Sequence, residues 1–240
     1  MPPLAKIRRA GLAGTLAAGG ATAIRASDRL RARGGPTLAG DRWVEWSFCA
    51  ARLSSGEGRT LDFGADIGFL ALAAAHRGHQ VIAFDRLPSS LEYTHERVTA
   101  VQGDILESPP DGQFDQIINC SSIEHVGLGG RYGSPDARDG DLRAMQVLRD
   151  LLRPGGCMIL TVPVGRDLIC QPYHRIYGEE RLPRLLDGYA VAESQFWRKD
   201  PARRQWVASP RESALMEVGS ERFYALGLFV LTSAADNTKK

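Results

Sequence analysis

Strand-type runs that alternate with helix-forming segments constrain the fold of this chain more than any other feature of its sequence. Runs rich in β-branched and aromatic residues are predicted as seven strands, at 59–64, 80–85, 98–104, 114–120, 157–165, 189–197 and 224–232. Amphipathic or alanine-rich segments are predicted as helices at 42–53, 68–78, 141–152 and 179–186. Strands joined through helices form right-handed βαβ units, so we expect an α/β fold with a doubly wound, mostly parallel seven-stranded sheet and helices on both faces. The last two runs have no helix between them, which predicts that they form an antiparallel pair at one edge of the sheet, with the last strand antiparallel.

The first 35 residues differ in composition from the rest of the chain. Residues 1–35 are rich in alanine and glycine and carry seven basic side chains against one acidic side chain, Asp28. Because the whole chain has a formal net charge of +2, the remainder is net acidic, which argues against a nucleic-acid partner. We expect 1–35 to be a poorly ordered or helical N-terminal tail and 36–235 to be a single domain. The alternative for the tail is a twin-arginine export signal, since RRAGLAGTLAAGG has a basic start and an apolar middle.

The composition is that of a globular protein, with 43% hydrophobic and 24% charged residues. No uninterrupted apolar run is long enough to span a bilayer, so we expect no membrane span. The four cysteines, Cys49, Cys120, Cys157 and Cys170, have no C-x-x-C spacing, and three of them fall in apolar segments. This pattern is typical of reduced thiols and predicts a cytoplasmic protein.

The first predicted strand leads into LDFGADIGF, which has the features of a nucleotide-binding loop. Gly64 allows the backbone to turn past a ligand, and Gly68 allows close packing at the start of the next helix. Asp85 ends the second strand, where a carboxylate can accept both hydroxyls of a ribose, and Asp104 ends the third, where it can accept an adenine amino group. Because the carboxyl ends of parallel strands meet at one edge of a sheet, these residues together predict a nucleotide cofactor site. Taken singly, each is also compatible with an ordinary turn or an exposed capping acid.

On these residues the chain resembles the Rossmann-like S-adenosylmethionine-dependent methyltransferases, over about residues 42–232. LDFGADIG is similar to their glycine loop, VIAFD to their ribose-binding strand, QGD to their adenine-binding turn, and LLRPGGCMILTVP to the turn and strand after their fourth helix. The resemblance implies S-adenosyl-L-methionine as cofactor. The residues that it assigns to cofactor binding are Asp62, Gly64, Ala65, Asp66, Gly68, Asp85, Arg86, Gly103, Asp104, Ile105, Asn119, Cys120 and Ser121.

More narrowly, RWVEW, SSIEHVGLGGRYG, DGDLRAMQVLRDLLRPGG and HRIYGEERLPRLLDGY resemble a little-characterised bacterial branch associated with sugar and secondary-metabolite modification. One position departs from the family pattern, because the loop has Asp66 where a glycine or another small residue is usual. Asp66 either holds the ammonium group of the cofactor or weakens cofactor binding through its bulk. The second alternative implies a methyltransferase fold that does not methylate.

The fourth predicted strand is followed by an acid and a histidine. The resemblance implies that residues 119–125 lie beside the transferred methyl group, which places Glu124 and His125 for proton chemistry. Histidine suits the removal of a proton from an attacking hydroxyl at neutral pH, and Glu124 could orient the ring or hold acceptor hydroxyls. His174, in PYHRIYG after the fifth strand, is the second candidate base. In the alternative interpretation, Glu124 caps a helix and His125 is a satisfied, partly buried residue.

Further polar residues fall on the same rim of the predicted sheet. Candidates for contacts with the acceptor are Arg131, Tyr132, Arg175 and Tyr177. A structural turn is the alternative for the last two and for His174. Asp139 and Asp141 offer oxygen atoms to a divalent ion, but no third ligand has a diagnostic spacing, so we expect a helix cap and no metal site.

The sequence therefore predicts a methyltransferase that O-methylates a hydroxyl on a small polar acceptor, such as a sugar, glycoside or natural product, with a histidine as general base. The alternative is a cofactor-binding or scaffold protein with a methyltransferase fold. A nicotinamide-dependent oxidoreductase is disfavoured because the full G-x-G-x-x-G pattern is absent. No basic, aromatic-interleaved module supports nucleic-acid methylation. The oligomeric state stays open, with a homodimer as one alternative.

Overall fold

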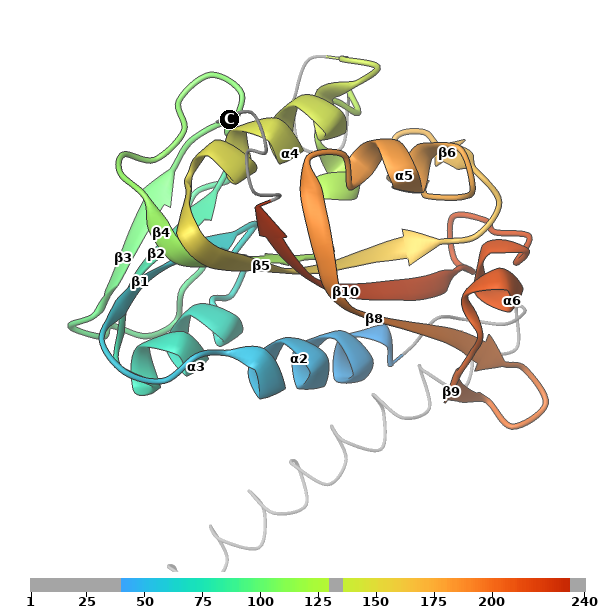
Figure 1. Cartoon of the computed structure of the whole chain (residues 1–240), viewed down its shortest axis with the longest axis horizontal. Coiled ribbons are helices and arrows are strands. Elements are labelled where there is room, and N and C mark those ends of the chain that lie inside the picture. The colour runs from blue at the N-terminus through green and yellow to red at the C-terminus, as the bar shows by residue number, and fades with distance from the viewer. Residues whose placement is uncertain (1–39, 130–135, 234–240) are drawn as a thin grey trace, which may run out of the picture. The chain divides into compact units, whose positions relative to one another are not determined.

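The central sheet of the computed structural model has eight strands within the described residues, 40–129 and 136–233. Their order is β3-β2-β1-β4-β5-β10-β8-β9 (Figure 1). The strands are β1 (Gly58–Phe63), β2 (His79–Asp85), β3 (Val98–Gln102), β4 (Phe114–Cys120), β5 (Leu152–Val164), β8 (Tyr189–Asp200), β9 (Gln205–Ala208) and β10 (Ala225–Ser233). A separate ribbon pairs β6 (Leu168–Cys170) with β7 (His174–Ile176). The tail predicted at residues 1–35 lies outside the described residues.

The direction of the strands confirms the predicted α/β fold. β1 pairs in parallel with β2 and β4, β2 pairs in parallel with β3, and β4 pairs in parallel with β5. β10, the last strand, is antiparallel to both of its neighbours, β5 and β8. It pairs with β8 as predicted, but it lies inside the sheet, and the edge strand on that side is β9. The sheet has one strand more than the seven predicted, because β9 turns back along the end of β8 and pairs with it.

The order of the strands reverses between β1 and β4. The chain winds outward from β1 through β2 to β3, and then returns to place β4 on the other side of β1. In open α/β sheets, ligands bind outside the carboxyl ends of the strands at such a reversal. The fold therefore favours a ligand site at the ends of β1 and β4.

Helices cover both faces of the sheet, as predicted. α2 (Asp41–Arg52) and α3 (Phe69–His76) lie on one face, and α4 (Gly140–Asp150) and α5 (Arg181–Leu185) lie on the other (Figure 1). Successive side chains of a strand point to opposite faces. Accordingly, Ile117 of β4 packs in the cluster on the α4 side, whereas Ile118 packs in the cluster on the α2 side. None of the helices in the described part of the chain has the length and hydropathy needed to cross a bilayer.

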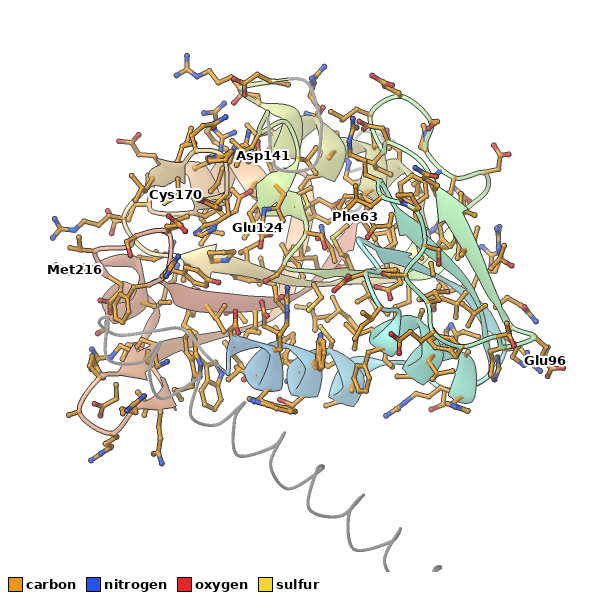
Figure 2. All side chains as sticks on the ribbon, turned by 180° about the vertical axis from the view of Figure 1, so that it is seen from behind. Phe63, Glu96, Glu124, Asp141, Cys170 and Met216 are labelled. Atoms are coloured by element: carbon orange, nitrogen blue, oxygen red, sulfur yellow. The ribbon has the colours of Figure 1, made fainter. Side chains whose placement is uncertain are left out.

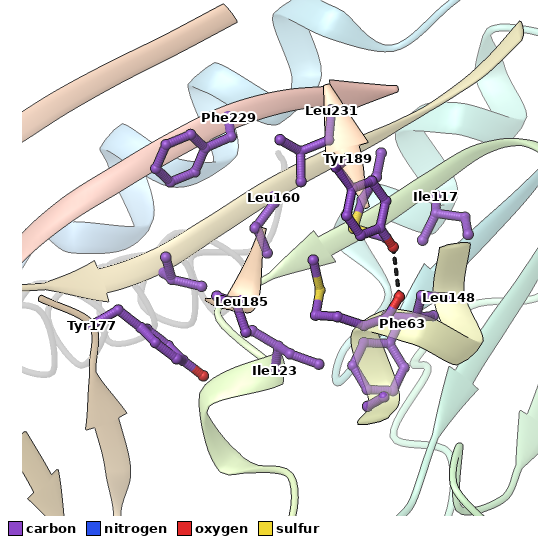
Figure 3. Packing of buried hydrophobic residues seen from close by; sticks show 14 of the residues in the cluster. Phe63, Ile117, Ile123, Leu148, Leu160, Tyr177, Leu185, Tyr189, Phe229 and Leu231 are labelled. Atoms are coloured by element: carbon purple, nitrogen blue, oxygen red, sulfur yellow. Dashed lines mark hydrogen bonds between the residues drawn. The ribbon is translucent and has the colours of Figure 1, made fainter. Parts of the chain in front are cut away.

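The larger of the two clusters fixes α4 and α5 to the sheet. Leu148 of α4 and Leu185 of α5 pack with Leu160 of β5 (Figure 3). The hydroxyl of Tyr189 donates to the carbonyl of Met145 at 2.7 Å (Figure 3). This bond gives the hydroxyl of the buried Tyr189 ring a hydrogen-bond partner, as a polar group in an apolar core requires. The short helix α6 (Arg211–Leu215) and the 3₁₀ turn η2 (Ile123–His125) complete the described elements. α6 lies between β8 and β10, where the sequence predicted no helix.

The connection from β2 to β3 is irregular, in contrast to the crossovers from β1 to β2 and from β4 to β5, which contain helices α3 and α4. Residues 86–97 form no helix. Pro88 disfavours the helical conformation for Leu87, and Ser89 and Ser90 compete for backbone hydrogen bonds outside helices. The irregular chain instead brings Leu87, Pro88 and Ser90 to the wall of a cavity.

Candidate functional site

A cavity of about 700 Å³ opens at the carboxyl ends of β1, β2, β3 and β4. Its volume is in the range of small-molecule sites. It is lined by many of the residues predicted for the site: Gly64, Asp66, Asp85, Arg86, Gly103, Asp104, Ile105, Cys120, Ser121 and His125. Arg131 and Tyr132, which were predicted to contact the acceptor, lie outside the described residues.

The loop after β1 brings the backbone close to the turn after β4. Gly64 has a φ of +74°, and a Cβ atom built on it would lie 2.5 Å from the Cβ of Ser122. Only glycine combines this left-handed backbone with so close an approach. Ala65 and Gly68 belong to the same loop, and the hydroxyl of Tyr93 donates to the carbonyl of Gly68 at 2.5 Å. The loop is therefore held on both sides, by β4 and by the β2–β3 connection.

Asp85 is held in one orientation by two backbone N–H groups. Its Oδ1 accepts from the N–H of Leu87 at 2.9 Å, and its Oδ2 accepts from the N–H of Asp66 at 3.1 Å. Each carboxylate oxygen has a second lone pair, so the side chain can also accept hydroxyl groups from the cavity. Asp66 itself is exposed and has a φ of +48°. An aspartate thus occupies a left-handed position that favours glycine.

Asp104 pairs with an arginine from the end of the neighbouring strand. Its Oδ2 forms an ion pair with Arg86, and its Oδ1 accepts from the N–H of Leu106 at 2.9 Å. A Cβ atom at Gly103 would lie 2.9 Å from the ring of Phe84, so only a glycine fits between that ring and the cavity. This end of the cavity therefore combines the side-chain-free backbone of Gly103, the ion pair between Arg86 and Asp104, and the nearby ring of Phe84.

Asp62 lies behind the cavity rather than in its wall. Its side chain is buried and accepts a hydrogen bond from the N–H of Ala71 in α3. Burial raises the pKa of Asp62 to about 7; the hydrogen bond from Ala71 opposes this rise, and the charge of Asp85 adds to it. The structure therefore places Asp62 where it ties β1 to α3 beneath the glycine loop.

The three residues predicted at the end of β4 point in different directions. Asn119 is fully buried, and its Oδ1 accepts from the N–H of Ile123 at 3.3 Å, so it shapes the turn from the core side. Cys120 and Ser121 line the cavity. Ser121 has a φ of +49°, and its hydroxyl donates to Glu45 of α2.

The η2 turn carries the two residues predicted for proton chemistry. His125 lines the cavity, and its Nδ1 lies 2.6 Å from the carbonyl oxygen of Tyr173. A carbonyl oxygen can only accept, so the proton of the neutral ring is on Nδ1. The Nε2 atom lies 3.8 Å from Oε1 of Glu124.

Glu124 is 2% exposed and lies on the side of the sheet that α4 covers (Figure 2). Burial raises the pKa of Glu124 to about 8. Its Oε2 has no hydrogen-bond partner among the described residues. A buried carboxyl group in this state holds its proton more readily than an exposed glutamate.

The residues around the second predicted histidine do not line the cavity. His174 is buried and packs edge-on against Tyr224, with 5.1 Å between ring centroids, and against His125, with 6.5 Å. Arg175 is fully buried and donates to the carbonyl of Val126 at 2.6 Å. The structure thus brings His174 behind His125, and it uses Arg175 to hold the chain that follows η2.

Tyr177 and Asp141, at the start of α4, form a second buried group. The Tyr177 hydroxyl donates to Asp141 Oδ2 at 3.1 Å, and Arg181 Nε donates to the same atom at 3.0 Å. The prediction that Asp139 and Asp141 cap α4 is wrong in its details, because the N-cap residue Asp139 makes no capping hydrogen bond and pairs with Arg181 instead, at 3.2 Å. Within the described ranges, no group of three or more His, Cys, Asp or Glu side chains could hold a metal ion.

Two residues of α2 belong to this region and were not predicted. Arg42 lines the cavity, and its NH1 donates to Oε2 of Glu45 at 3.0 Å. Glu45 is fully buried. The signal that could have found them is their spacing in RWVEW, because residues three apart lie on the same face of a helix. An acid on the apolar face of a helix also calls for a buried partner.

Comparisons of the sequence with known proteins match parts of the chain. A family model described as "Caenorhabditis protein of unknown function, DUF268" matches residues 108–212, which is less than half of the chain. The chain is 30% identical over 127 residues to the ubiquinone biosynthesis O-methyltransferase of Xanthomonas campestris, a match that covers 49% of this chain and 48% of that protein. The chain therefore spans about half the length of these relatives.

Comparison of the structure with solved structures covers more of the chain. The 1,6-didemethyltoxoflavin-N1-methyltransferase of Burkholderia thailandensis, solved with 1,6-didemethyltoxoflavin and S-adenosylhomocysteine, is similar with a TM-score of 0.53 and 18% identity, covering 90% of each chain. The N-methyltransferase NodS of Bradyrhizobium japonicum, solved with S-adenosylhomocysteine, is similar with a TM-score of 0.55 and 16% identity, covering 80% of this chain and 87% of that one. At these identities the likeness is one of fold.

Proposed function

We propose that this chain, which has the fold of the Rossmann-like S-adenosylmethionine-dependent methyltransferases, binds S-adenosyl-L-methionine in the cavity and transfers its methyl group to a small polar acceptor. The observation that carries the proposal is that Gly64, Asp85 and Asp104, which lie at the carboxyl ends of three different strands, line one cavity together with His125. Three residue types suited to one nucleotide cofactor thus meet beside a candidate base.

The residues present fit this cofactor. Gly64 lets the backbone of the β1 loop pass close to Ser122 in the wall of the cavity, Asp85 offers oxygens to ribose hydroxyls, and Asp104 lies at the end suited to adenine. The rest of the wall, near Ser121, includes Arg42, whose charge suits the carboxylate of the amino-acid end. When bound, the cofactor supplies a methyl group activated by a positively charged sulfur.

The finer proposal is O-methylation of a hydroxyl on a sugar, glycoside or natural product. The relative in Xanthomonas campestris is an O-methyltransferase, which supports an oxygen atom as the methyl acceptor, although the match covers about half of that protein. The two solved structures are N-methyltransferases, but they share only the fold with this chain. The crowding of His125 and Glu124 beside the cavity is what favours a hydroxyl, since a hydroxyl must lose a proton as its oxygen attacks.

His125 is the residue proposed to take that proton. The carbonyl of Tyr173 holds the ring through Nδ1 and leaves the basic lone pair on Nε2. Once Nε2 is protonated the ring is positively charged, and Glu124, 3.8 Å away, stabilises this charge when it is ionised. His174, the second candidate, packs behind His125 and would act by orienting its ring.

Calorimetry with S-adenosylhomocysteine tests the proposal. The wild-type protein is expected to bind this ligand, and Asp85→Ala should weaken binding at least tenfold, because hydrogen bonds to a charged acceptor contribute about 1.5–3 kcal/mol each. Asp111→Ala is the matched control, since Asp111 is an exposed acid that does not line the cavity. Absence of binding, or equal affinity in Asp85→Ala, would refute the assignment. Mass spectrometry of small molecules that co-purify with the protein is the direct route to the acceptor.

A second candidate function is a cofactor-binding or scaffold protein that does not methylate. The observation that favours it is Asp66, an exposed acid at a φ of +48° whose N–H already occupies one oxygen of Asp85. Replacement of Asp66 by glycine separates the two interpretations. If Asp66 obstructs the site, Asp66→Gly binds S-adenosylhomocysteine more tightly than the wild type; if Asp66 holds the ammonium group, the variant binds it more weakly.

A further inference from the structure

We infer that Glu45 is a positioning residue for the proposed cofactor site, because from α2 it fixes both the Arg42 guanidinium and the turn at Ser121 in the wall of the cavity. The inference rests on the proposed function, since it assigns this part of the wall to the amino-acid end of the cofactor. Glu45 does not itself line the cavity.

One buried carboxylate joins three separate elements at this point. Oε2 of Glu45 accepts from Arg42 at 3.0 Å, within α2. Oε1 accepts from the hydroxyl of Thr161, in β5, at 3.0 Å. The same Oε1 accepts from the hydroxyl of Ser121, directly after β4. Both oxygens of a fully buried acid are therefore satisfied, and two of the three donors, Arg42 and Ser121, line the cavity.

A carboxylate is a costly way to fill a buried position if packing is its only purpose. Burial raises the pKa of Glu45, while the charge of Arg42 and the hydroxyls of Ser121 and Thr161 lower it. Buried ion pairs contribute little net stability compared with well-packed apolar side chains. We therefore infer that the ion pair between Arg42 and Glu45 serves to orient groups in the wall of the cavity.

Arg42 is the first group that Glu45 orients. Its side chain is 46% exposed and lines the cavity. Among the described residues, the only hydrogen bond of its guanidinium is the one from NH1 to Glu45. The remaining N–H groups are thus available to a ligand, and a fixed guanidinium presents them as a fork that matches a carboxylate.

Ser121 is the second group that Glu45 orients. Its φ of +49° is a left-handed conformation that is unfavourable for serine. The hydrogen bond to Glu45 helps to hold this conformation, and the next residue, Ser122, packs against Gly64 of the glycine loop. Loss of the Glu45 carboxylate should therefore disturb both the Arg42 guanidinium and the turn at Ser121, which belong to the same end of the cavity.

Two ligands that share an adenosine group test the inference. S-adenosylhomocysteine carries the amino-acid end, whereas 5′-methylthioadenosine lacks it. Glu45→Gln keeps the size of the side chain but removes the charge that orients Arg42. We expect about tenfold weaker binding of S-adenosylhomocysteine and unchanged binding of 5′-methylthioadenosine, both measured by calorimetry at one temperature.

The matched control is Glu193→Gln, which removes an ion pair between Glu193 and Arg52 at the other end of α2 without touching a lining residue. It should bind both ligands as the wild type does. Arg42→Gln should reproduce the selective loss, and the double variant should lose little more than either single variant, because the two residues act as one unit.

Equal losses for both ligands in Glu45→Gln, or no loss for S-adenosylhomocysteine, would overturn the inference and leave the proposed function standing. Arg42→Gln with wild-type affinity for S-adenosylhomocysteine would overturn it even if Glu45→Gln did not fold. Failure of the wild-type protein to bind S-adenosylhomocysteine would instead overturn the proposed function.

Discussion

Two buried acids behind the cavity make the stability of the folded protein depend on pH. Burial raises the pKa of Asp62 to about 7 and the pKa of Glu124 to about 8. A carboxyl group with a higher pKa in the folded state than in the unfolded state binds protons more strongly when folded. Its stabilising contribution is complete below the ordinary carboxyl pKa, near 4. This contribution is lost as the pH rises through the pKa of the group in the folded state. The protein should therefore lose stability between about pH 4 and pH 8 through these groups.

Replacement of Asp62 by asparagine should remove one of these contributions. Asparagine keeps an oxygen that can accept the N–H of Ala71 but has no charge to bury. We expect the free energy of unfolding of Asp62→Asn, relative to the wild type, to rise by on the order of 2–4 kcal/mol between pH 5 and pH 8.5. Urea denaturation at these two pH values measures it, and a difference that stays constant with pH would contradict the assignment.

Replacement of His125 by alanine should separate catalysis from binding. Turnover of the acceptor should fall by roughly 10²–10⁴-fold, the usual contribution of a general base, while the affinity for S-adenosylhomocysteine stays the same. His76→Ala is the control, because His76 is exposed at the end of α3 and outside the cavity. Full activity in His125→Ala would mean that positioning of the acceptor, rather than proton removal, dominates the rate.

The residues that sequence reasoning could place are those at strand ends. Gly64, Asp85 and Asp104 end predicted strands, and a parallel sheet brings the carboxyl ends of its strands together regardless of the length of the loops. Glu45 was missed because its partners, Ser121 and Thr161, lie far along the chain, and only the tertiary structure brings them to α2. An arginine buried among carbonyl groups, such as Arg175, cannot be told from a ligand-binding arginine by sequence, since both stand in polar segments.

At the scale of elements, the glycine loop depends on both its backbone conformation and its contact with the β4 turn. Gly64→Ala should destabilise the protein by more than the left-handed conformation alone, which costs alanine about 1–2 kcal/mol, because its Cβ would overlap Ser122. Gly155→Ala isolates the first effect: Gly155 has a φ of +81°, but a Cβ there would meet nothing within 4 Å.

Thermal unfolding of the two glycine variants compares the effects directly. For a domain of this size, 1 kcal/mol corresponds to roughly 2–4 °C, so Gly155→Ala should lower the melting temperature by a few degrees and Gly64→Ala by clearly more. Ser122→Gly in the Gly64→Ala background should restore part of the difference. Equal shifts for Gly64→Ala and Gly155→Ala would show that the contact with Ser122 relaxes without cost.

The order of strands and helices was largely predictable, because hydrophobic period and glycine or proline breaks are local signals. The strands that were not predicted are short and depend on pairing. β9 is four residues long and exists as a strand because it pairs with the end of β8. Within the described part of the chain, β6 and β7 pair with each other alone, and each has three residues, which is too short for a reliable periodic pattern.

At the scale of the whole molecule, the reversal of strand order creates the cavity and sets what each part of the chain contributes. Elements far apart in the sequence meet there: α2 supplies Arg42, the β1 loop supplies Gly64, and η2 supplies His125. The domain that sequence analysis predicts for residues 36–235 should therefore contain everything that the cavity needs. This expectation can be tested by truncation.

Removal of residues 1–33 should leave cofactor binding and stability nearly unchanged. The segment has few large apolar residues and precedes the GGPTLAG stretch, so it offers little surface to bury against a domain. We expect the affinity for S-adenosylhomocysteine to stay within about twofold and the melting temperature to change by less than about 5 °C, since a larger fall would correspond to more than 1 kcal/mol. A longer deletion, of residues 1–46, removes Arg42 and Glu45 and should abolish tight binding of S-adenosylhomocysteine. Similar behaviour of the two truncated proteins, in either direction, would show that the boundary between tail and domain does not lie before α2.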